Sequence, residues 1–259
     1  MSEKPYIRTI HVLSCSGGTV ISKCLSAMEK TIVISEIHPD RLRMGFNPFD
    51  PVSLLLTQTK LGQNATLRRN FFLKRIKEIY EISKLNNFNL ILRDHTHTDY
   101  LENKDIEQIN SKISLIDVVR KDFRLLPLLI IRNPLHAYQS LLNNNMRQST
   151  SSFNDYCNRV MLMINTYKDL DCSIFKYEDF CLNPDKELDK MCAILKINYL
   201  NDYYKRFSKI PMTGNSGRAV GSEKIVSLDP RPISEELKKE SEKSKSFKEI
   251  CYRFDYKIN

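Results

Sequence analysis

Residues 14–19, Ser-Cys-Ser-Gly-Gly-Thr, form the segment of this chain with the clearest chemical capability. The apolar residues Ile10, Val12 and Leu13 precede it, and others follow it at helical spacing from Val20 to Met28. This pattern predicts a strand, a turn and a helix that begins at the turn. Unbonded N–H groups and the positive end of the helix dipole favour an anion at a helix N-terminus, and glycine lets a ligand approach the backbone. The chemistry that the segment suits is the binding of phosphate or sulfate.

The segment differs from the phosphate loop of nucleoside triphosphatases. That loop ends in Gly-Lys-Ser/Thr, which places a lysine and a magnesium-binding hydroxyl on the phosphates, whereas residues 17–19 are Gly-Gly-Thr. An ordinary corner between a strand and a helix can also contain Ser-Gly-Gly-Thr. The interpretation of the segment therefore depends on the rest of the chain.

An arginine stands at the end of the longest apolar run. Residues 125–131 are typical of a parallel strand covered on both faces, Arg132 follows directly, and Asn133-Pro134 predicts the start of a helix. Ligands bind at the carboxyl edge of open α/β sheets, and a guanidinium group suits bidentate contact with phosphate. Arg132 is predicted either to bind phosphate or to form an ion pair that stabilises the fold.

Two further segments carry residues suited to a nucleotide or an anion. Residues 177–179, Tyr-Glu-Asp, follow a predicted strand at 172–176, and residues 214–218 form a glycine-containing loop that ends in an arginine. Four such segments in this order are far more specific than any one of them.

In these motifs the chain resembles the sulfotransferases that use 3′-phosphoadenosine 5′-phosphosulfate (PAPS), over residues 7–232 and in a form closer to the bacterial members. The resemblance implies that residues 15–20 cradle the 5′-phosphosulfate, that Arg132 and Ser140 bind the 3′-phosphate, and that Tyr177 lies near the adenine. A late loop would close over the 3′-phosphate. The implied donor-binding residues are Cys15, Ser16, Gly17, Gly18, Thr19, Val20, Arg132, Ser140, Tyr177, Ser216, Gly217 and Arg218. The product would be adenosine 3′,5′-bisphosphate (PAP), and the scheme requires no metal.

Transfer of a sulfuryl group to a hydroxyl or amine acceptor needs a general base. His95 and His97 lie in residues 93–97, Arg-Asp-His-Thr-His, after a predicted strand at 88–92. The resemblance implies His95 as the base, with His97 as the other candidate. On an extended segment the two histidines would face the same side.

The chain departs from the family pattern at Cys15, where many relatives have a lysine that stabilises the bridging oxygen. A neutral thiol cannot replace that charge, so another cation or the backbone donors must do so. The candidates are Lys23, one helical turn beyond Thr19, and Arg93, which precedes the proposed base.

Strands that alternate with helices predict an α/β fold with a mostly parallel, doubly wound sheet, in one domain over residues 1–259 with a charged helix from about residue 234. A further short helix is predicted over residues 105–116. The basic residues of positions 68–77 are interpreted as the solvated face of one amphipathic helix. The net charge of +9 suggests anionic partners, but no nucleic-acid-binding signature accompanies it.

Seven cysteines at irregular spacing suit reduced thiols and a cytoplasmic protein, and no run is long and apolar enough to span a bilayer. A small-molecule or glycan acceptor is expected to contact residues 36–51, which include Arg41, Arg43, Phe46 and Phe49. Two alternative functions remain: a nucleotide-dependent small-molecule kinase and a non-catalytic nucleotide-binding protein. The sequence leaves the oligomeric state open.

Overall fold

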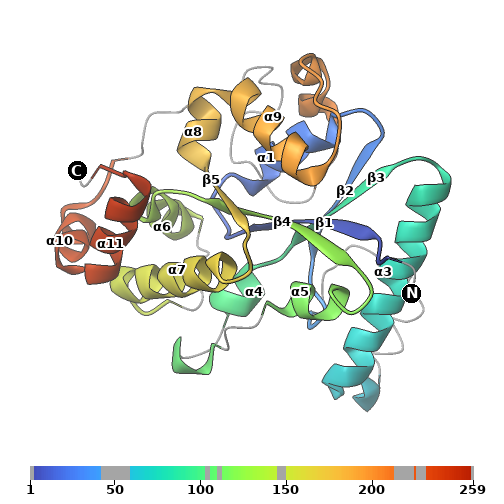
Figure 1. Cartoon of the computed structure of the whole chain (residues 1–259). Helices are drawn as coiled ribbons and strands as arrows, with labels where there is room; N and C mark the ends of the chain where they lie inside the picture. The colour runs from blue at the N-terminus through green and yellow to red at the C-terminus, as the bar shows by residue number, and fades with distance from the viewer. Residues whose placement is uncertain are drawn as a thin grey trace.

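The computed structural model describes residues 3–41, 59–102, 106–109, 113–144, 150–212, 225 and 232–257, and in this part of the chain five parallel strands form a central sheet (Figure 1). The strands are β1 (Tyr6–Val12), β2 (Thr31–Ile37), β3 (Asn89–Asp94), β4 (Arg124–Ile131) and β5 (Ser173–Lys176). Their order across the sheet is β2-β3-β1-β4-β5. β1 is thus central, and it pairs with β3 from Arg8 to Ile10 and with β4 along its whole length.

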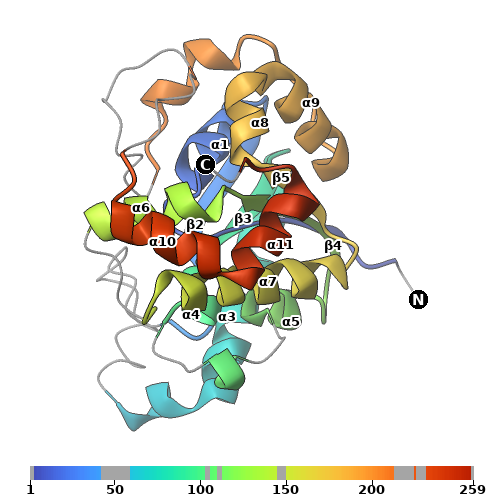
Figure 2. The same ribbon diagram turned by 90° about the vertical axis from the view of Figure 1, so that its left-hand side faces the viewer.

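Helices cover both faces of the sheet, which confirms the predicted doubly wound α/β fold (Figures 1 and 2). One face carries α1 (Gly18–Ser26), α8 (Tyr177–Leu182) and α9 (Pro184–Leu195). The other face carries α3 (Ala65–Leu85), α4 (His97–Tyr100), α5 (Ser114–Val119) and α7 (Phe153–Lys168). The remaining helices are α6 (Pro134–Asn143), α10 (Glu235–Lys243) and α11 (Lys245–Phe254), and short 3₁₀ turns lie at Lys60–Gln63, Ile106–Gln108, Tyr203–Lys205 and Phe207–Lys209. Among the described residues, no helix combines the length and apolar character needed to cross a membrane.

Helix starts follow the capping residues of the sequence. The Asn133 side chain accepts a hydrogen bond from the Leu135 N–H, and Pro134 occupies the first turn of α6, as predicted. Asn183 caps α9 in the same way. None of the seven cysteines, all of which lie in the described part of the chain, forms a disulfide.

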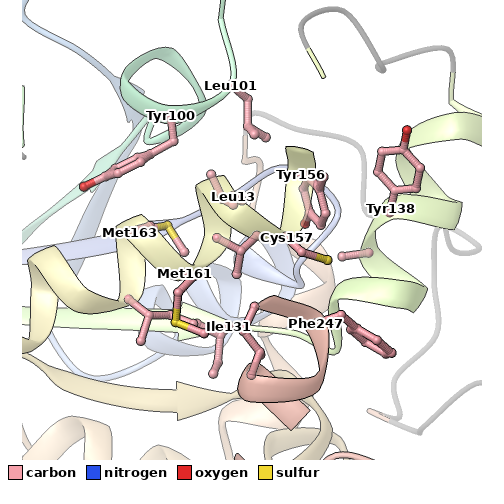
Figure 3. Close-up of a cluster of buried hydrophobic side chains, with 14 of the residues drawn as sticks. Leu13, Tyr100, Leu101, Ile131, Tyr138, Tyr156, Cys157, Met161, Met163 and Phe247 are labelled. Carbon is pink, nitrogen blue, oxygen red and sulfur yellow. The ribbon is translucent and has the colours of Figure 1, made fainter. Parts of the chain in front are cut away.

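The largest part of the core lies between α7, α6, α11 and the sheet (Figure 3). The apolar face of α7 is buried, and Figure 3 shows Tyr138, Tyr156 and Phe247 gathered around Cys157. The rings of Phe153 and Phe247 meet edge to face with their centroids 5.2 Å apart, a favourable aromatic geometry. This contact fixes the C-terminal helix onto α7.

Two predicted helices differ in the structure. The segment predicted as a helix over residues 105–116 contains a 3₁₀ turn at Ile106–Gln108, and α5 begins only at Ser114. The reason is a tertiary cap: the Asp99 carboxylate accepts hydrogen bonds from the Ser114 N–H at 3.0 Å and from its hydroxyl at 2.6 Å. The charged helix predicted from residue 234 is two helices, because Ser244 ends α10 and caps α11.

We predict that Phe247→Ala lowers the free energy of unfolding by about 3–5 kcal/mol, because it empties a fully buried site. Tyr252→Ala on the same helix removes a ring that is 90% exposed and should change stability by less than about 0.5 kcal/mol. Urea unfolding of both variants measures the difference. Equal losses would contradict the described packing of α11.

Candidate functional site

The loop between β1 and α1 has the conformation of an anion-binding turn. Cys15 and Gly17 have left-handed backbones, with φ of 64° and 86°, and the Ser16 N–H donates to the Leu13 carbonyl at 3.2 Å. The helix starts at Gly18, and no described side chain caps it. The N–H groups of its first turn therefore point into the loop without intrahelical acceptors.

Both glycines of the loop are required by their neighbours. A Cβ atom at Gly17 would lie 2.0 Å from Cδ2 of Tyr177, so the tyrosine ring rests directly on this glycine. A Cβ atom at Gly18 would lie 2.4 Å from Cγ1 of Val12 and 3.2 Å from Nη2 of Arg93. The loop thus has an aromatic ring against one glycine and a guanidinium group beside the next.

Arg132 joins the end of β4 to the loop. Its Nη1 atom donates to the Cys15 carbonyl at 2.8 Å and lies 3.4 Å from the Ser140 hydroxyl. The guanidinium carbon lies 5.3 Å from the centroid of the Tyr177 ring. Three segments that the sequence analysis selected separately therefore meet at one place: the loop, the end of β4 with Ser140, and the start of α8.

A second contact joins the end of β4 to the segment that follows β5. The Asn133 N–H donates to Oε1 of Glu178 at 2.9 Å, and burial raises the pKa of that carboxyl group. Tyr177 and Glu178 begin α8 directly after β5. The Tyr-Glu-Asp segment thus belongs to a helix, and its first two residues are anchored to the end of β4.

Arg93 is the candidate cation that the structure brings to the loop. It is 7% exposed, and its guanidinium donates to the Ser35 hydroxyl at 2.9 Å and pairs with Glu36 at 3.3 Å. Glu36 has a left-handed backbone, with φ of 59°, where the pairing of β2 with β3 is interrupted. Burial lowers the pKa of Arg93, but a guanidinium group stays charged at neutral pH. Lys23 lies in the last turn of α1, and its side chain forms no hydrogen bond or ion pair with the described residues.

His95 and His97 lie close together but not on one extended segment. His97 begins α4, so the expectation of an extended chain was wrong; the ring centroids are 5.9 Å apart. The helix forms here because Asp99, two residues later in the same helix, is held by His38 at 3.2 Å and by Ser114. Neither partner is close to the histidines in the sequence.

The His95 imidazole lies beside a charged pair. The Arg41 guanidinium donates to Nε2 of His95 and pairs with Glu102 at 3.2 Å. Burial, followed by the positive charge of Arg41, lowers the pKa of His95 to about 3. The ring is therefore neutral at neutral pH, and its Nε2 atom accepts from Arg41.

His97 is more deeply placed, at 6% exposure. Its buried Nδ1 atom has no hydrogen-bond partner among the described residues, and burial lowers its pKa as well. Two neutral imidazoles thus stand beside each other after β3.

Several residues of the site were missed or interpreted differently from the sequence. Arg69 binds both oxygens of Asp40, at 3.0 and 3.2 Å from Nε, and Arg68 lies 3.4 Å from the same carboxylate, so this end of the basic helix is not a purely solvated face. His11 and His38 received no role, yet they make buried contacts with Asp94 and Asp99 below the histidine pair. No local motif marks these pairs, because their members are 61 to 83 residues apart.

Ser216, Gly217 and Arg218 lie outside the described residues, as do Arg43, Phe46 and Phe49. Within the part of the chain that the structure covers, no three His, Cys, Asp or Glu side chains are arranged to hold a metal ion.

Comparison with known proteins identifies the fold. No protein-family model matches the chain, and no curated protein matches its sequence. Among solved structures, the sulfotransferase domain from the curacin biosynthetic pathway is similar with a TM-score of 0.60 and 14% identity, over 100% of both chains. The sulfotransferase domain from the Synechococcus PCC 7002 olefin synthase has a TM-score of 0.60 and 13% identity, over 100% of this chain and 98% of that one. Mouse sulfotransferase SULT7A1 complexed with PAP has a TM-score of 0.53 and 12% identity, over 98% and 87%. The chain has the fold of these sulfotransferases.

We predict that His95 stays neutral in the folded protein as the pH falls from 6.5 toward its pKa of about 3. His95 in the unfolded chain binds the proton already near pH 6.5. This group therefore lowers the stability of the fold as the pH decreases from 6.5 to about 3. Arg41→Gln should raise the pKa of His95, because the second cause of its lowering is removed. Titration of the imidazole by NMR measures both values, and a midpoint near 6.5 in the wild-type protein would contradict the described environment.

Proposed function

We propose that the protein transfers the sulfuryl group of PAPS to a hydroxyl or amine group of a small-molecule or glycan acceptor and releases PAP. One observation carries this proposal: two elements that can bind anions lie next to each other, and the Cys15 carbonyl group joins them. One element is the uncapped start of α1, and the other is Arg132 with Ser140. The similarity in fold to sulfotransferases supports the proposal.

The residues present suit the two charged ends of PAPS. Arg132 uses Nη1 for Cys15 and Ser140, and its Nε and Nη2 donors have no partner among the described residues. These donors can receive the 3′-phosphate, whereas the N–H groups of α1 can receive the 5′-phosphosulfate. Tyr177, packed between Gly17 and Arg132, offers an aromatic surface for the adenosine. Arg218 is proposed to close the site from its loop.

The chemistry requires a base and stabilisation of the leaving group. PAPS supplies the sulfuryl group, whose bond to the 5′-phosphate oxygen breaks as the acceptor oxygen or nitrogen bonds to sulfur. In this proposal the acceptor displaces the Arg41 guanidinium from Nε2 of His95, this nitrogen then takes the acceptor's proton, and His97 orients the acceptor. The N–H groups of α1 stabilise the negative charge that develops on the phosphate oxygen.

In this proposal Arg93 takes the role of the loop lysine that many sulfotransferases have where this chain has Cys15. Its guanidinium lies beside Gly18, at the start of the helix that binds the phosphosulfate in this proposal. Glu36 and Ser35 hold it there, so the cation is in place before any ligand arrives. A preorganised charge of this kind lowers the barrier without a cost of reorganisation.

We predict that Arg132→Ala weakens PAP binding by about 2–4 kcal/mol, because the 3′-phosphate loses a charged partner. Arg124→Ala, at the opposite end of the same strand, is the matched control and should bind PAP as the wild type does. Calorimetry without magnesium measures the affinities, with adenosine 5′-monophosphate and ATP as competitors. Undiminished preference for PAP over the monophosphate in Arg132→Ala would refute the phosphate assignment. Tighter, magnesium-dependent ATP binding would favour a kinase.

We predict that His95→Ala reduces single-turnover sulfuryl transfer by about 10²–10⁴-fold and leaves PAP affinity nearly unchanged, because a base contributes to rate and not to donor binding. His97→Ala should raise the KM for the acceptor or reduce the rate only modestly. Radiolabelled PAPS with an acceptor panel provides the assay. If the transfer rate collapses in His97→Ala and not in His95→Ala, the roles of the two histidines are exchanged. If the wild-type protein binds PAP but transfers no sulfuryl group, the result favours a non-catalytic binding protein.

A further inference from the structure

Thr96, which separates the two candidate catalytic histidines, has an unusual set of partners. It is fully buried and occupies the residue before α4, where a threonine hydroxyl ordinarily caps the helix. The hydroxyl makes no such cap. Instead it accepts a hydrogen bond from the Val12 N–H at 3.1 Å and donates to Oδ2 of Asp94 at 3.0 Å.

The bond to Val12 reaches the strand that leads into the donor loop. Residue pairing between β1 and β3 ends at Ile10 and Arg93. The Thr96 hydroxyl takes the place of a strand partner for Val12, the last residue of β1. One side chain therefore links the strand that carries the loop to the segment that carries both histidines.

Asp94 accepts from this hydroxyl, and His11 in turn contacts Asp94. Asp94 is 1% exposed and His11 is 0% exposed, and Nδ1 of His11 donates to the same Asp94 oxygen at 3.2 Å. The other ring nitrogen of His11 lies 2.9 Å from the Thr9 hydroxyl, and the Tyr167 ring packs on the imidazole with a centroid distance of 4.8 Å. In such dry surroundings a hydrogen-bonded chain is strong and leaves its members little freedom.

The chain of hydrogen bonds is not the arrangement that stability alone would favour. The second oxygen of Asp94 is buried without a hydrogen-bond partner among the described residues, and a buried acceptor in that state lowers stability. Replacing buried ionic groups by apolar ones is often neutral or stabilising. A role in geometry accounts for the presence of three buried polar side chains here.

We propose that His11, Asp94 and Thr96 are positioning residues, which hold His95 and His97 at a set place relative to the loop between β1 and α1. The inference rests on the proposed sulfuryl transfer, because that reaction needs the base in line with a donor in the loop. A misplacement of about 1 Å is enough to reduce such a reaction about 100-fold.

The test compares Thr96→Val, which keeps the shape and removes the hydroxyl, with Thr96→Ser, which keeps the hydroxyl. Thr31→Val is the matched control, because Thr31 is also a buried strand threonine and, among the described residues, its hydroxyl bonds only to the nearby Glu29 carbonyl. Asp94→Asn provides a second break in the same chain if Thr96→Val does not fold. Each variant is measured by hydrogen exchange of the Val12 amide, by the NMR signals of the two histidine rings, by PAP affinity and by kcat and KM.

We expect Thr96→Val to lose protection of the Val12 amide, to shift both histidine signals and to lower kcat about 10- to 100-fold with PAP affinity within about twofold. Thr96→Ser should restore all of these values, and Thr31→Val should alter none of them. Unchanged histidine signals and Val12 protection in Thr96→Val would overturn the proposal, whether or not the protein proves to be a sulfotransferase. Shifted signals with an unchanged kcat, in an active wild-type enzyme, would overturn the positioning role and leave the proposed function intact.

Discussion

The parallel pairing of β1 with β3 on one side and β4 on the other is the constraint on which the site depends. Parallel strands end at the same edge, so whatever follows each of the three strands must meet its neighbours. The loop after β1, Arg132 after β4 and the histidine segment after β3 are brought together for this reason alone. Slippage of either pairing by one residue would reverse the faces on which the side chains lie and would separate the groups.

Within that frame, the charged groups of the site are held by partners that leave them little freedom. Arg93 is fixed by Glu36 and Ser35, and Arg132 is fixed by the Cys15 carbonyl. Burying such groups costs free energy that their contacts only partly offset, which is common where a site must be ready before its ligand arrives. The left-handed backbone of Glu36, the partner of Arg93, is a further local cost to stability at the site.

The sequence was sufficient to predict the sheet, the helix start at Asn133-Pro134 and the meeting of the loop after β1 with the end of β4, because periodicity, capping residues and strand ends are local properties. It could not predict that His97 would begin a helix. That helix depends on Asp99 and on its distant partners His38 and Ser114, and no local pattern connects them. Of the two cations proposed to replace a loop lysine, Arg93 lies beside Gly18 because the strand register turns it toward α1, and spacing along the chain does not contain this fact. The roles of all these residues in catalysis remain proposals.

The contact between Gly17 and Tyr177 restricts how this site can evolve. Since a Cβ atom at position 17 would overlap the tyrosine ring, a larger residue there requires a smaller or displaced one at 177. The two positions lie 160 residues apart but share one small volume. Sequence drift at either one should therefore leave a matching substitution at the other, so that covariation between these columns would reveal the contact in any set of natural variants.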